Sequence, residues 1–172
     1  MLMASLLFIG PHSAWPETNQ TSEYQVKAAY LYHFAKFVEW PSDTTANVSP
    51  TLTVCVLGKS PFGDALNTIS GKTVRGRRVV ITFIKTIDDL KECDILFVSM
   101  SEKAKLGQIL NSVASRSILT ISDIKGFAAA GGMIGFVSVS DKVRFEINQR
   151  ASQRSYLRIS AQLLKLATIV TE

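Results

Sequence analysis

The sequence predicts a single α/β domain built on a mostly parallel four-strand sheet, with a C-terminal antiparallel hairpin and helices on both faces. Four short apolar runs are separated by segments of helical character, the pattern of parallel strands joined by crossover helices. Two further apolar runs flank a short turn and predict the hairpin. The length of 172 residues fits one domain.

The first predicted element is a helix over residues 21–38, which ends before Trp40-Pro41 because the residue before a proline avoids the helical conformation. On a helical wheel, one side of this helix carries a row of apolar and aromatic residues, while Ala28 faces away. That row comprises Val26, Ala29, Tyr30, His33, Phe34, Phe37 and Trp40. We interpret His33, at its centre, as a histidine of the core rather than a ligand or a pH-sensing group.

Leu31 and Val38 extend this apolar arc to roughly 200°, which is wider than packing against a sheet needs. We therefore predict a second buried contact for the helix, against the terminal helix, a dimer mate or another protein. The candidate partner or dimer surface is Leu31, Phe34, Val38 and Trp40.

The central part of the chain predicts four strands that alternate with short helices. The strands lie in the apolar runs TLTVCVLG, RRVVITFI, DILFVS and SILTIS, which are residues 51–58, 77–84, 94–99 and 117–122. The helices between them are predicted at residues 61–71, 86–93 and 101–115, with Thr86 and Ser101 as caps of the second and third. In the common 2-1-3-4 strand order, the first and third strands are neighbours.

The C-terminal third predicts an irregular element at residues 123–132, a hairpin at residues 133–148 around a Ser140-Asp141 turn, and a long helix from Gln149 onward. On that helix a stripe of arginines recurs every four residues, and we interpret it as a solvated face or as an anion or partner contact. The stripe is Arg150, Arg154 and Arg158. A possible ligand or anion pocket lies where the last strand meets the helix, the alternative being a polar edge strand. Its candidate residues are Glu146, Asn148 and Arg158.

The charge pattern does not favour nucleic acid as a partner. The net charge is +5, and most basic residues are scattered among acidic ones. The basic segment at residues 75–78, RGRR, is predicted in a turn between a helix and a strand. We interpret it as solvated loop charge, with an anion or acidic-partner contact as the alternative.

Catalytic, cofactor and metal motifs are missing from the sequence. Gly58-Lys59-Ser60 lacks the upstream glycine of a phosphate loop, since Thr53 stands in its place, and Pro61 removes a backbone donor. The chain also lacks the dinucleotide pattern, the nucleophile elbow and any His/Cys/Asp cluster at metal-ligand spacing. We therefore expect no catalytic residues, no cofactor and no metal.

The N-terminus predicts export from the cytoplasm. Residues 2–14 are apolar, too short to span a bilayer, and end in His12-Ser13-Ala14, a small-x-small pattern typical of signal-peptidase sites. We assign residues 1–14 to a truncated signal peptide, because the basic n-region is missing, and residues 15–22 to a flexible segment. A hydrophobic N-terminal arm is the alternative.

Cys55 and Cys93, in separate apolar strands, can form one disulfide in an oxidising compartment. Neighbouring first and third strands would bring the two residues within reach of each other. Such a bridge stabilises the fold by roughly 4 kcal/mol on the chain-entropy account. Two buried thiols are the alternative, which a cytosolic location would favour.

Several segments in the same order make the chain resemble the YfiR family over residues 24–170. They are KAAYLYHFAKFVEWP at residues 27–41, VCVLGKSPFGDAL at 54–66, GKTVRGRRV at 71–79, CDILFVS at 93–99, LTISDIKGFAAAGGMIGFV at 119–137, VRFEIN at 143–148 and LRISAQLLKLA at 157–167. The resemblance assigns residues 23–172 to one YfiR-like domain.

The resemblance implies a periplasmic, non-catalytic protein that represses an inner-membrane diguanylate cyclase by binding its periplasmic part, which lowers cyclic di-GMP and biofilm formation. It also implies a homodimer, an outer-membrane lipoprotein that relieves the repression, and redox sensitivity. Cys55 and Cys93 fall where one family disulfide lies, and this chain lacks the second cysteine pair. Members also occur beside other sensor proteins. A periplasmic small-molecule-binding sensor component is the rival function.

Overall fold

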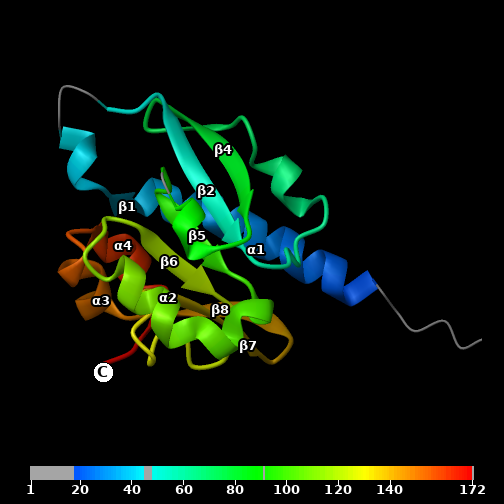
Figure 1. The fold of residues 1–172 in the computed structure, drawn as a ribbon. Coiled ribbons are helices and arrows are strands. Elements are labelled where there is room, and N and C mark those ends of the chain that lie inside the picture. The colour runs from blue at the N-terminus through cyan, green and yellow to red at the C-terminus, as the bar shows by residue number, and fades with distance from the viewer. Residues whose placement is uncertain (1–17, 45–47, 91, 172) are drawn as a thin grey trace, which may run out of the picture.

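The computed structural model describes residues 18–44, 48–90 and 92–171, and the predicted signal peptide lies outside them. Its centre is a mixed sheet of eight strands in the order β10-β8-β7-β6-β5-β2-β4-β3 (Figure 1). The strands are β2 (Thr51–Leu57), β3 (Thr73–Val74), β4 (Arg77–Ile84), β5 (Ile95–Val98), β6 (Leu119–Ser122), β7 (Ile134–Val139), β8 (Lys142–Ile147) and β10 (Thr168–Ile169).

The four predicted strands are β2, β4, β5 and β6, and they form a parallel group in the predicted 2-1-3-4 order. The sheet is larger and more mixed than predicted. β7 adds to β6 in parallel and joins β8 in the predicted hairpin, while β10 pairs with β8 and β3 with β4. The two strands of this sheet that the sequence does not indicate, β3 and β10, have only two residues each, too few to show a period.

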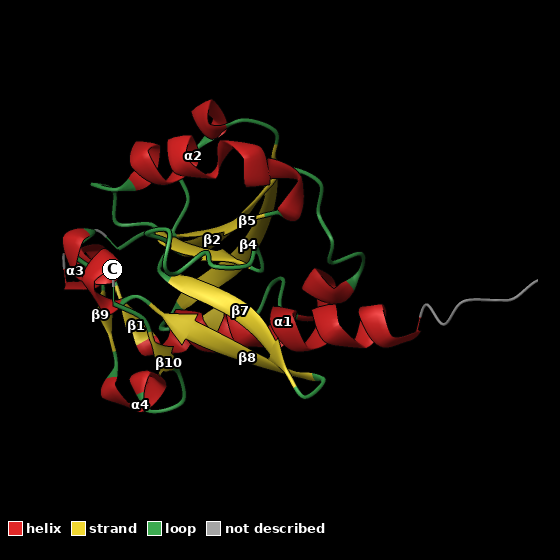
Figure 2. Ribbon diagram, turned by 90° about the horizontal axis from the view of Figure 1, so that it is seen from below, coloured by secondary structure: helices red, strands yellow, loops and turns green. Residues whose placement is uncertain are grey.

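Helices cover both faces of the sheet, as the sequence predicts (Figure 2). α1 (Thr18–Phe37) and the 3-10 turn η2 (Ala65–Thr68) lie on one face, and η4 (Met100–Lys105) with α2 (Leu106–Val113) lies on the other. Successive strand residues point to opposite faces. Val54 and Val56 therefore join the core under α1, while Cys55 and Leu57 join the core under α2.

The buried face of α1 differs from the predicted one. The buried residues of α1 are Lys27, Ala28, Leu31, Phe34 and Ala35, and Val38, the first residue of β1 (Val38–Glu39), continues this face. Of the predicted row, Phe34 and Trp40 are buried, but Val26 is 44% exposed, and His33 is exposed rather than a core residue. The prediction failed because the true face includes a buried lysine, which a pattern of apolar residues alone cannot include.

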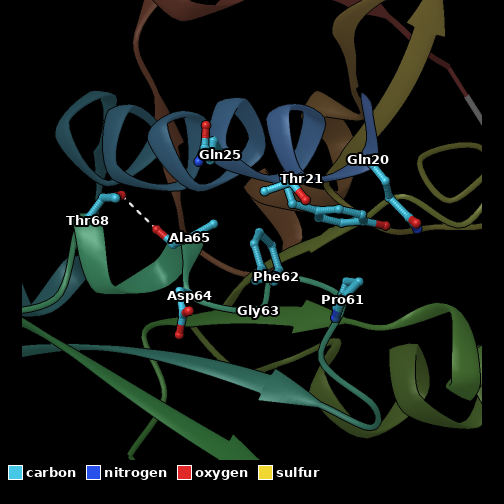
Figure 3. Close-up of a pocket in the computed structure, with 10 residues that line it drawn as sticks. Gln20, Thr21, Gln25, Pro61, Phe62, Gly63, Asp64, Ala65 and Thr68 are labelled. Atoms are coloured by element: carbon cyan, nitrogen blue, oxygen red, sulfur yellow. Dashed lines mark hydrogen bonds between the residues drawn. The ribbon is translucent and has the colours of Figure 1, made fainter. Parts of the chain in front are cut away.

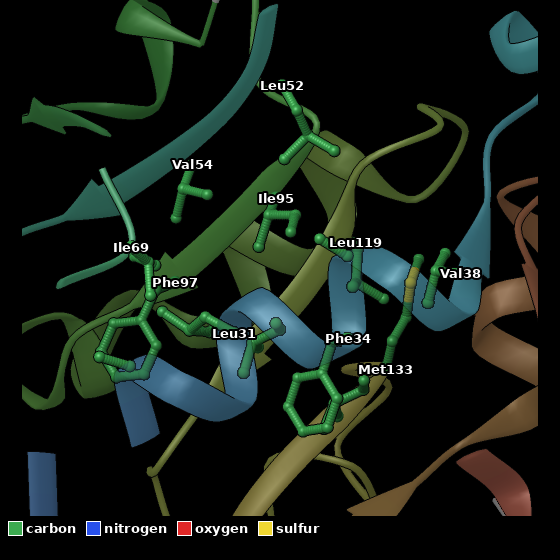
Figure 4. Packing of buried hydrophobic residues seen from close by; sticks show 14 of the residues in the cluster. Leu31, Phe34, Val38, Leu52, Val54, Ile69, Ile95, Phe97, Leu119 and Met133 are labelled. Atoms are coloured by element: carbon green, nitrogen blue, oxygen red, sulfur yellow. The ribbon is translucent and has the colours of Figure 1, made fainter. Parts of the chain in front are cut away.

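The proposed partner surface on α1 lies inside the monomer. Leu31, Phe34 and Val38 are 0% exposed, and Trp40 is 3% exposed. Figure 4 shows Leu31, Phe34 and Val38 packed among side chains of the sheet. This placement corrects the prediction, because these side chains are not accessible to a dimer mate or another protein while the monomer keeps this fold.

The predicted long terminal helix is wrong. The chain forms α3 (Gln149–Arg154), β9 (Arg158–Ile159), α4 (Ala161–Leu164) and then β10. Tyr156 adopts a left-handed backbone with a φ of 61°, which ends the helical path. β9 pairs antiparallel with β1 (Val38–Glu39), so Arg158 lies on a strand and does not continue a stripe from Arg150 and Arg154.

The shorter helices also differ from the prediction. Residues 61–71 contain only η2, and residues 86–93 contain the 3-10 turn η3 (Ile87–Asp89), where Thr86 forms a capping box as expected. Residues 101–115 contain η4 and α2, which begin one residue earlier than predicted. Ser101 does not cap them, because it lies inside η4 and Ser99 stands at the N-cap position; the Ser101 Oγ accepts a hydrogen bond from the Lys59 N–H at 3.0 Å.

Cys55 and Cys93 form a disulfide, with their Cα atoms 5.9 Å apart. The bridge follows from the strand order, since β2 pairs directly with β5 and Cys93 lies two residues before β5. Cys55 is buried and Cys93 is half-buried. In the part of the chain that the structure describes, no helix is long and apolar enough to cross a membrane.

Candidate functional site

The predicted pocket at the end of β8 is not formed by its candidate residues. Asn148 is fully buried and caps α3, with its Oδ1 accepting from the Ala151 N–H and its Nδ2 donating to the Ala128 carbonyl, both at 2.9 Å. Glu146 lies on β8, between β7 and β10. The Arg158 side chain is 86% exposed on β9, with Nε 3.9 Å from a Glu39 oxygen. The clefts described below have other residues in their walls.

A cleft of about 680 Å³ lies at the carboxyl edge of the sheet, between the first half of α1 and the segment that follows β2 (Figure 3). Its walls are Gln20, Thr21, Tyr24 and Gln25 from α1, and Pro61, Phe62, Gly63, Asp64, Ala65 and Thr68 from the segment. The ring of Phe62 meets that of Tyr24 edge to face at 5.3 Å. Two aromatic rings among amides and hydroxyls suit a small molecule with a flat apolar part.

The position of this cleft follows from the topology. The chain leaves β2 for β4 on one side and later returns to β5 on the other, so the strand order reverses at β2. In open α/β sheets, ligands bind outside the carboxyl ends of the strands at such a reversal. The cleft wall formed by residues 61–68 begins at the carboxyl end of β2.

A buried ion pair lies beside the cleft. Lys27, only 4% exposed, places its Nζ 2.8 Å from Asp123 Oδ2 and 2.6 Å from Glu23 Oε1. The Tyr24 hydroxyl donates to the same Asp123 oxygen at 2.7 Å, and the lysine ammonium lies 4.3 Å from the centre of the Tyr24 ring. These contacts hold the first half of α1 against Asp123, the residue that follows β6.

The pKa of the Tyr24 phenol is raised well above its ordinary value. Burial is the largest cause, followed by the hydrogen bond to Asp123 and by the negative charges of Asp123 and Glu23. All of these disfavour the phenolate. Tyr24 is therefore a neutral hydrogen-bond donor, and it stands between the cleft and the buried carboxylate.

Two polar atoms at this edge lack a hydrogen-bond partner among the described residues: Asp123 Oδ1 and Ser99 Oγ. Val98 and Ser122 are paired in register, so Ser99 and Asp123 follow at neighbouring positions. Buried polar atoms without a partner are rare in folded proteins. Their position beside the cleft gives this edge further capacity for hydrogen bonds.

Sequence reasoning missed Tyr24, Lys27 and Asp123 as a group. One signal was present, because Glu23 and Lys27 are spaced i, i+4, a typical helical ion pair. The other was Asp123 directly after an apolar strand. Neither signal indicates that the two segments meet, since 96 positions separate Lys27 from Asp123.

The opposite edge of the sheet holds a second polar network. Arg77, 4% exposed, donates from Nη2 to Asp94 Oδ1 at 2.7 Å and to the Thr51 carbonyl at 2.7 Å, and Asp94 Oδ2 accepts from the Thr53 N–H at 2.8 Å. Arg77 therefore holds the start of β4 against β2, which corrects its interpretation as a solvated loop charge or anion contact. The half-buried Cys93 lies in the wall of a cleft of about 450 Å³ beside this network.

The fold and its clefts define a disulfide-bridged α/β domain with an open ligand-sized cleft at the carboxyl edge of its sheet. In the described residues, no group of three or more His, Cys, Asp or Glu side chains is placed to hold a metal ion. Within this class, the chain belongs to the YfiR/HmsC-like family, whose model matches residues 24–168. That family is regulatory and periplasmic.

Two solved structures are similar in fold. The ABC domain in complex with L-Trp from Streptococcus pneumoniae has a TM-score of 0.57 at 11% identity. A conserved domain protein from Vibrio cholerae has a TM-score of 0.59 at 8% identity. Each comparison covers 86% of this chain and 60% of the other, so this chain spans less than two thirds of either protein. At such identities the similarity concerns the fold alone.

Proposed function

We propose that the protein is a periplasmic, non-catalytic regulator that binds and represses a membrane-bound signalling enzyme, a diguanylate cyclase, and thereby lowers cyclic di-GMP and biofilm formation. The observation that carries this proposal is the family match over residues 24–168. The disulfide supports it, because such bridges persist in oxidising compartments such as the periplasm.

The proposed mechanism is occupancy. The protein binds the periplasmic part of the cyclase and stabilises its inactive state, and an outer-membrane lipoprotein relieves the repression by competing for the protein. The active form is proposed to be a homodimer. The sensor of another signalling system is an alternative partner.

Direct binding tests this proposal. Residues 15–172 in oxidised form should bind the purified periplasmic domain of a membrane-bound diguanylate cyclase from the same organism, as measured by calorimetry. Bovine serum albumin and a heat-unfolded sample of the chain serve as negative controls. Absence of binding at protein concentrations up to about 100 μM, which corresponds to about −5.5 kcal/mol, would contradict the proposal.

The cleft at the carboxyl edge favours a second function, that of a periplasmic small-molecule-binding sensor component. Thermal-shift screening against nucleotides and aromatic amino acids tests it, because a ligand that binds only the folded chain raises its melting temperature. Thr21→Trp, which fills the cleft from α1, should abolish any shift. Ala29→Trp, on an exposed position of the same helix, is the matched control. A shift that survives Thr21→Trp would exclude this cleft as the site.

A further inference from the structure

The sheet has an open edge along the second half of β4, which we define as residues 80–84. β3 is the only strand beyond β4 in the described chain, and it pairs only with Arg77 and Arg78. The residues just before β3 cover one more position, since Val79 exchanges hydrogen bonds with Gly71 and Lys72. From Val80 onward, no strand of the described residues lies on this side.

The direction of the backbone groups along the open edge follows from the hydrogen bonds on either side. The Arg78 N–H donates to the Pro50 carbonyl and the Ile84 carbonyl accepts from the Gly58 N–H, so even-numbered residues of β4 face β2. Val79 faces the other way. Because strand residues alternate, Ile81 and Phe83 direct their N–H and C=O groups outward at the open edge.

The side chains at this edge are apolar. Phe83 is 60% exposed and Val80 is 36% exposed, while Ile81 is half-buried. Natural edge strands are usually protected by an inward-pointing charge, a proline or a bulge. Residues 80–84 contain no charge or proline, and β4 pairs with β2 without interruption from Arg78 to Ile84.

Positive charge lies at both ends of the open edge. Arg78 and Lys72 are exposed at its start, and Lys85 is exposed at its end. The next acidic side chains, Asp88 and Asp89, lie on η3, and Asp89 accepts hydrogen bonds from the Thr86 N–H and hydroxyl at 3.2 and 3.1 Å. Between residues 72 and 85, which include the open edge and its two ends, every charged side chain is therefore basic.

We propose that this open edge binds an extended segment of the partner protein by strand addition, a segment with alternating apolar residues and acidic residues at its ends. This inference rests on the proposed function, and it names the surface through which that function is carried out. Ile81 and Phe83 would exchange main-chain hydrogen bonds with the added strand, Phe83 would pack on an apolar side chain, and Arg78 and Lys85 would pair with the acidic ends.

Charge decides between this partner and a second copy of the same chain. Antiparallel pairing of two copies of the open edge would place Ile81 opposite Phe83, with the two-fold axis at Thr82. Lys85 would then approach Val79 of the partner copy, beside the Lys72 that covers it. Bringing like charges together in this way is unfavourable, whereas acidic residues at these positions are favourable.

Phe83→Pro tests the inference sharply. The Phe83 N–H is not used in the β2–β4 ladder, so proline removes an outward donor and obstructs an added strand without breaking an internal hydrogen bond. Phe83→Ala keeps the donor and removes only the ring, and Leu166→Ala changes a 69% exposed apolar residue elsewhere. Thermal unfolding of each variant identifies any loss of fold.

Two probes are used: the periplasmic domain of the cyclase, and a peptide of alternating valine and threonine with two glutamates at each end. A peptide with lysines in place of the glutamates is its control. We expect Phe83→Pro to weaken binding by about tenfold or more, Phe83→Ala to weaken it less, and Leu166→Ala to leave it unchanged. Bound probe should slow hydrogen exchange of the Ile81 and Phe83 amides, and the lysine peptide should bind more weakly.

The possible results separate this inference from the proposed function. If the cyclase domain binds but the two amides stay unprotected and Phe83→Pro binds equally well, the open edge is not the docking surface and the function stands. If the cyclase domain does not bind but the glutamate peptide protects both amides, the edge binds strands and the function fails. Protection by neither probe overturns the inference.

Discussion

At the scale of single residues, Lys27 is a buried charge whose partners must replace the water that it has lost. It is buried with its ammonium between Asp123 and Glu23 and beside the Tyr24 ring. A buried charge is tolerated only where its partners compensate the loss of water. Position 27 therefore requires a cation to compensate the Asp123 carboxylate. A methionine would fit the apolar neighbours on the same helix face but would carry no charge.

We predict that Lys27→Met lowers the free energy of unfolding by about 3–5 kcal/mol at pH 7, because it leaves the Asp123 carboxylate buried without its cation. Urea unfolding followed by circular dichroism measures this loss. The double variant Lys27→Met/Asp123→Asn should recover part of it. A loss smaller than about 1 kcal/mol, typical of an exposed ion pair, would show that Lys27 is effectively solvated.

Tyr24 predicts a dependence of stability on alkaline pH. Its pKa is raised in the folded protein, chiefly by burial and then by Asp123. The unfolded chain therefore releases this proton at lower pH than the folded chain. The contribution of Tyr24 to stability is fully present below its unfolded pKa of about 10 and is lost as the pH rises above it.

Urea unfolding of the wild type and of Tyr24→Phe between pH 8 and pH 11 checks this prediction. The difference in stability between the two proteins should be constant below about pH 9.5 and should shrink at higher pH. Tyr32→Phe, which removes a phenol that donates to the Thr73 carbonyl at 3.1 Å, is the control for general alkaline effects. A difference that stays constant to pH 11 would contradict the raised pKa.

At the scale of elements, α1 is a core helix throughout its second half. Leu31 is 0% exposed and packs in the same cluster as strand residues from the parallel sheet. We predict that Leu31→Asp unfolds the monomer, with a loss of at least about 3 kcal/mol, because it buries an unpaired carboxylate. Ala29→Asp, at an exposed position of the same helix, should cost only about 0.7 kcal/mol, the difference in helix propensity between the two residues.

Thermal unfolding and size-exclusion chromatography distinguish this outcome from a loss of association. A Leu31→Asp protein that remains a folded monomer with an unchanged melting temperature would return Leu31 to the surface and revive a partner-binding role for α1.

The disulfide joins β2 to Cys93, two residues before the neighbouring strand β5, and closes a loop with a sequence separation of 38 residues. We predict that Cys55→Ser/Cys93→Ser loses about 3–4 kcal/mol of stability, mainly because the unfolded chain gains freedom. Reduction of the wild type with dithiothreitol should lower its melting temperature to about that of the variant. Reduction of the variant should leave its melting temperature unchanged. Equal melting temperatures of oxidised and reduced wild type would exclude a stabilising role for this bridge.

Other elements show what sequence alone could and could not predict. β2, β4, β5 and β6 were predictable, because each is an apolar run with a flanking helix or turn. The side of α1 that faces the core was not predictable, because Lys27 on that side is buried through contacts with Asp123, far along the chain. The C-terminal region was read as helix because its local pattern permits one, whereas the left-handed Tyr156 and the pairing of β9 with β1 depend on tertiary contacts.

The candidate sites show the same limit. The disulfide was predictable, since two cysteines in strands one and three meet in a common strand order. Asn148 was assigned to a candidate pocket, because a capping asparagine and a ligand-binding one look alike in sequence. The cleft at the carboxyl edge and the open edge of β4 could not be predicted without the strand order of the whole sheet. That order places the short β3 beyond β4 and so leaves part of β4 uncovered.

At the scale of the whole molecule, the structure separates three regions with different roles. The buried cores under α1 and α2 and the disulfide hold the domain together. The carboxyl-edge cleft offers a place for a small molecule, and the open edge of β4 offers a place for a partner strand. A ligand in the cleft contacts the segment that follows β2, the strand directly paired with β4. The two candidate surfaces are therefore connected through one strand.

Repression of a membrane-bound cyclase is the central claim for this protein, and one measurement tests it most directly. Cyclic di-GMP synthesis by the full-length cyclase in membrane vesicles is followed while oxidised residues 15–172 are added on the periplasmic side. We predict a saturable fall in the rate of synthesis with increasing protein, and little fall with Phe83→Pro. A rate that stays unchanged at saturating concentrations of folded, oxidised protein would contradict the account.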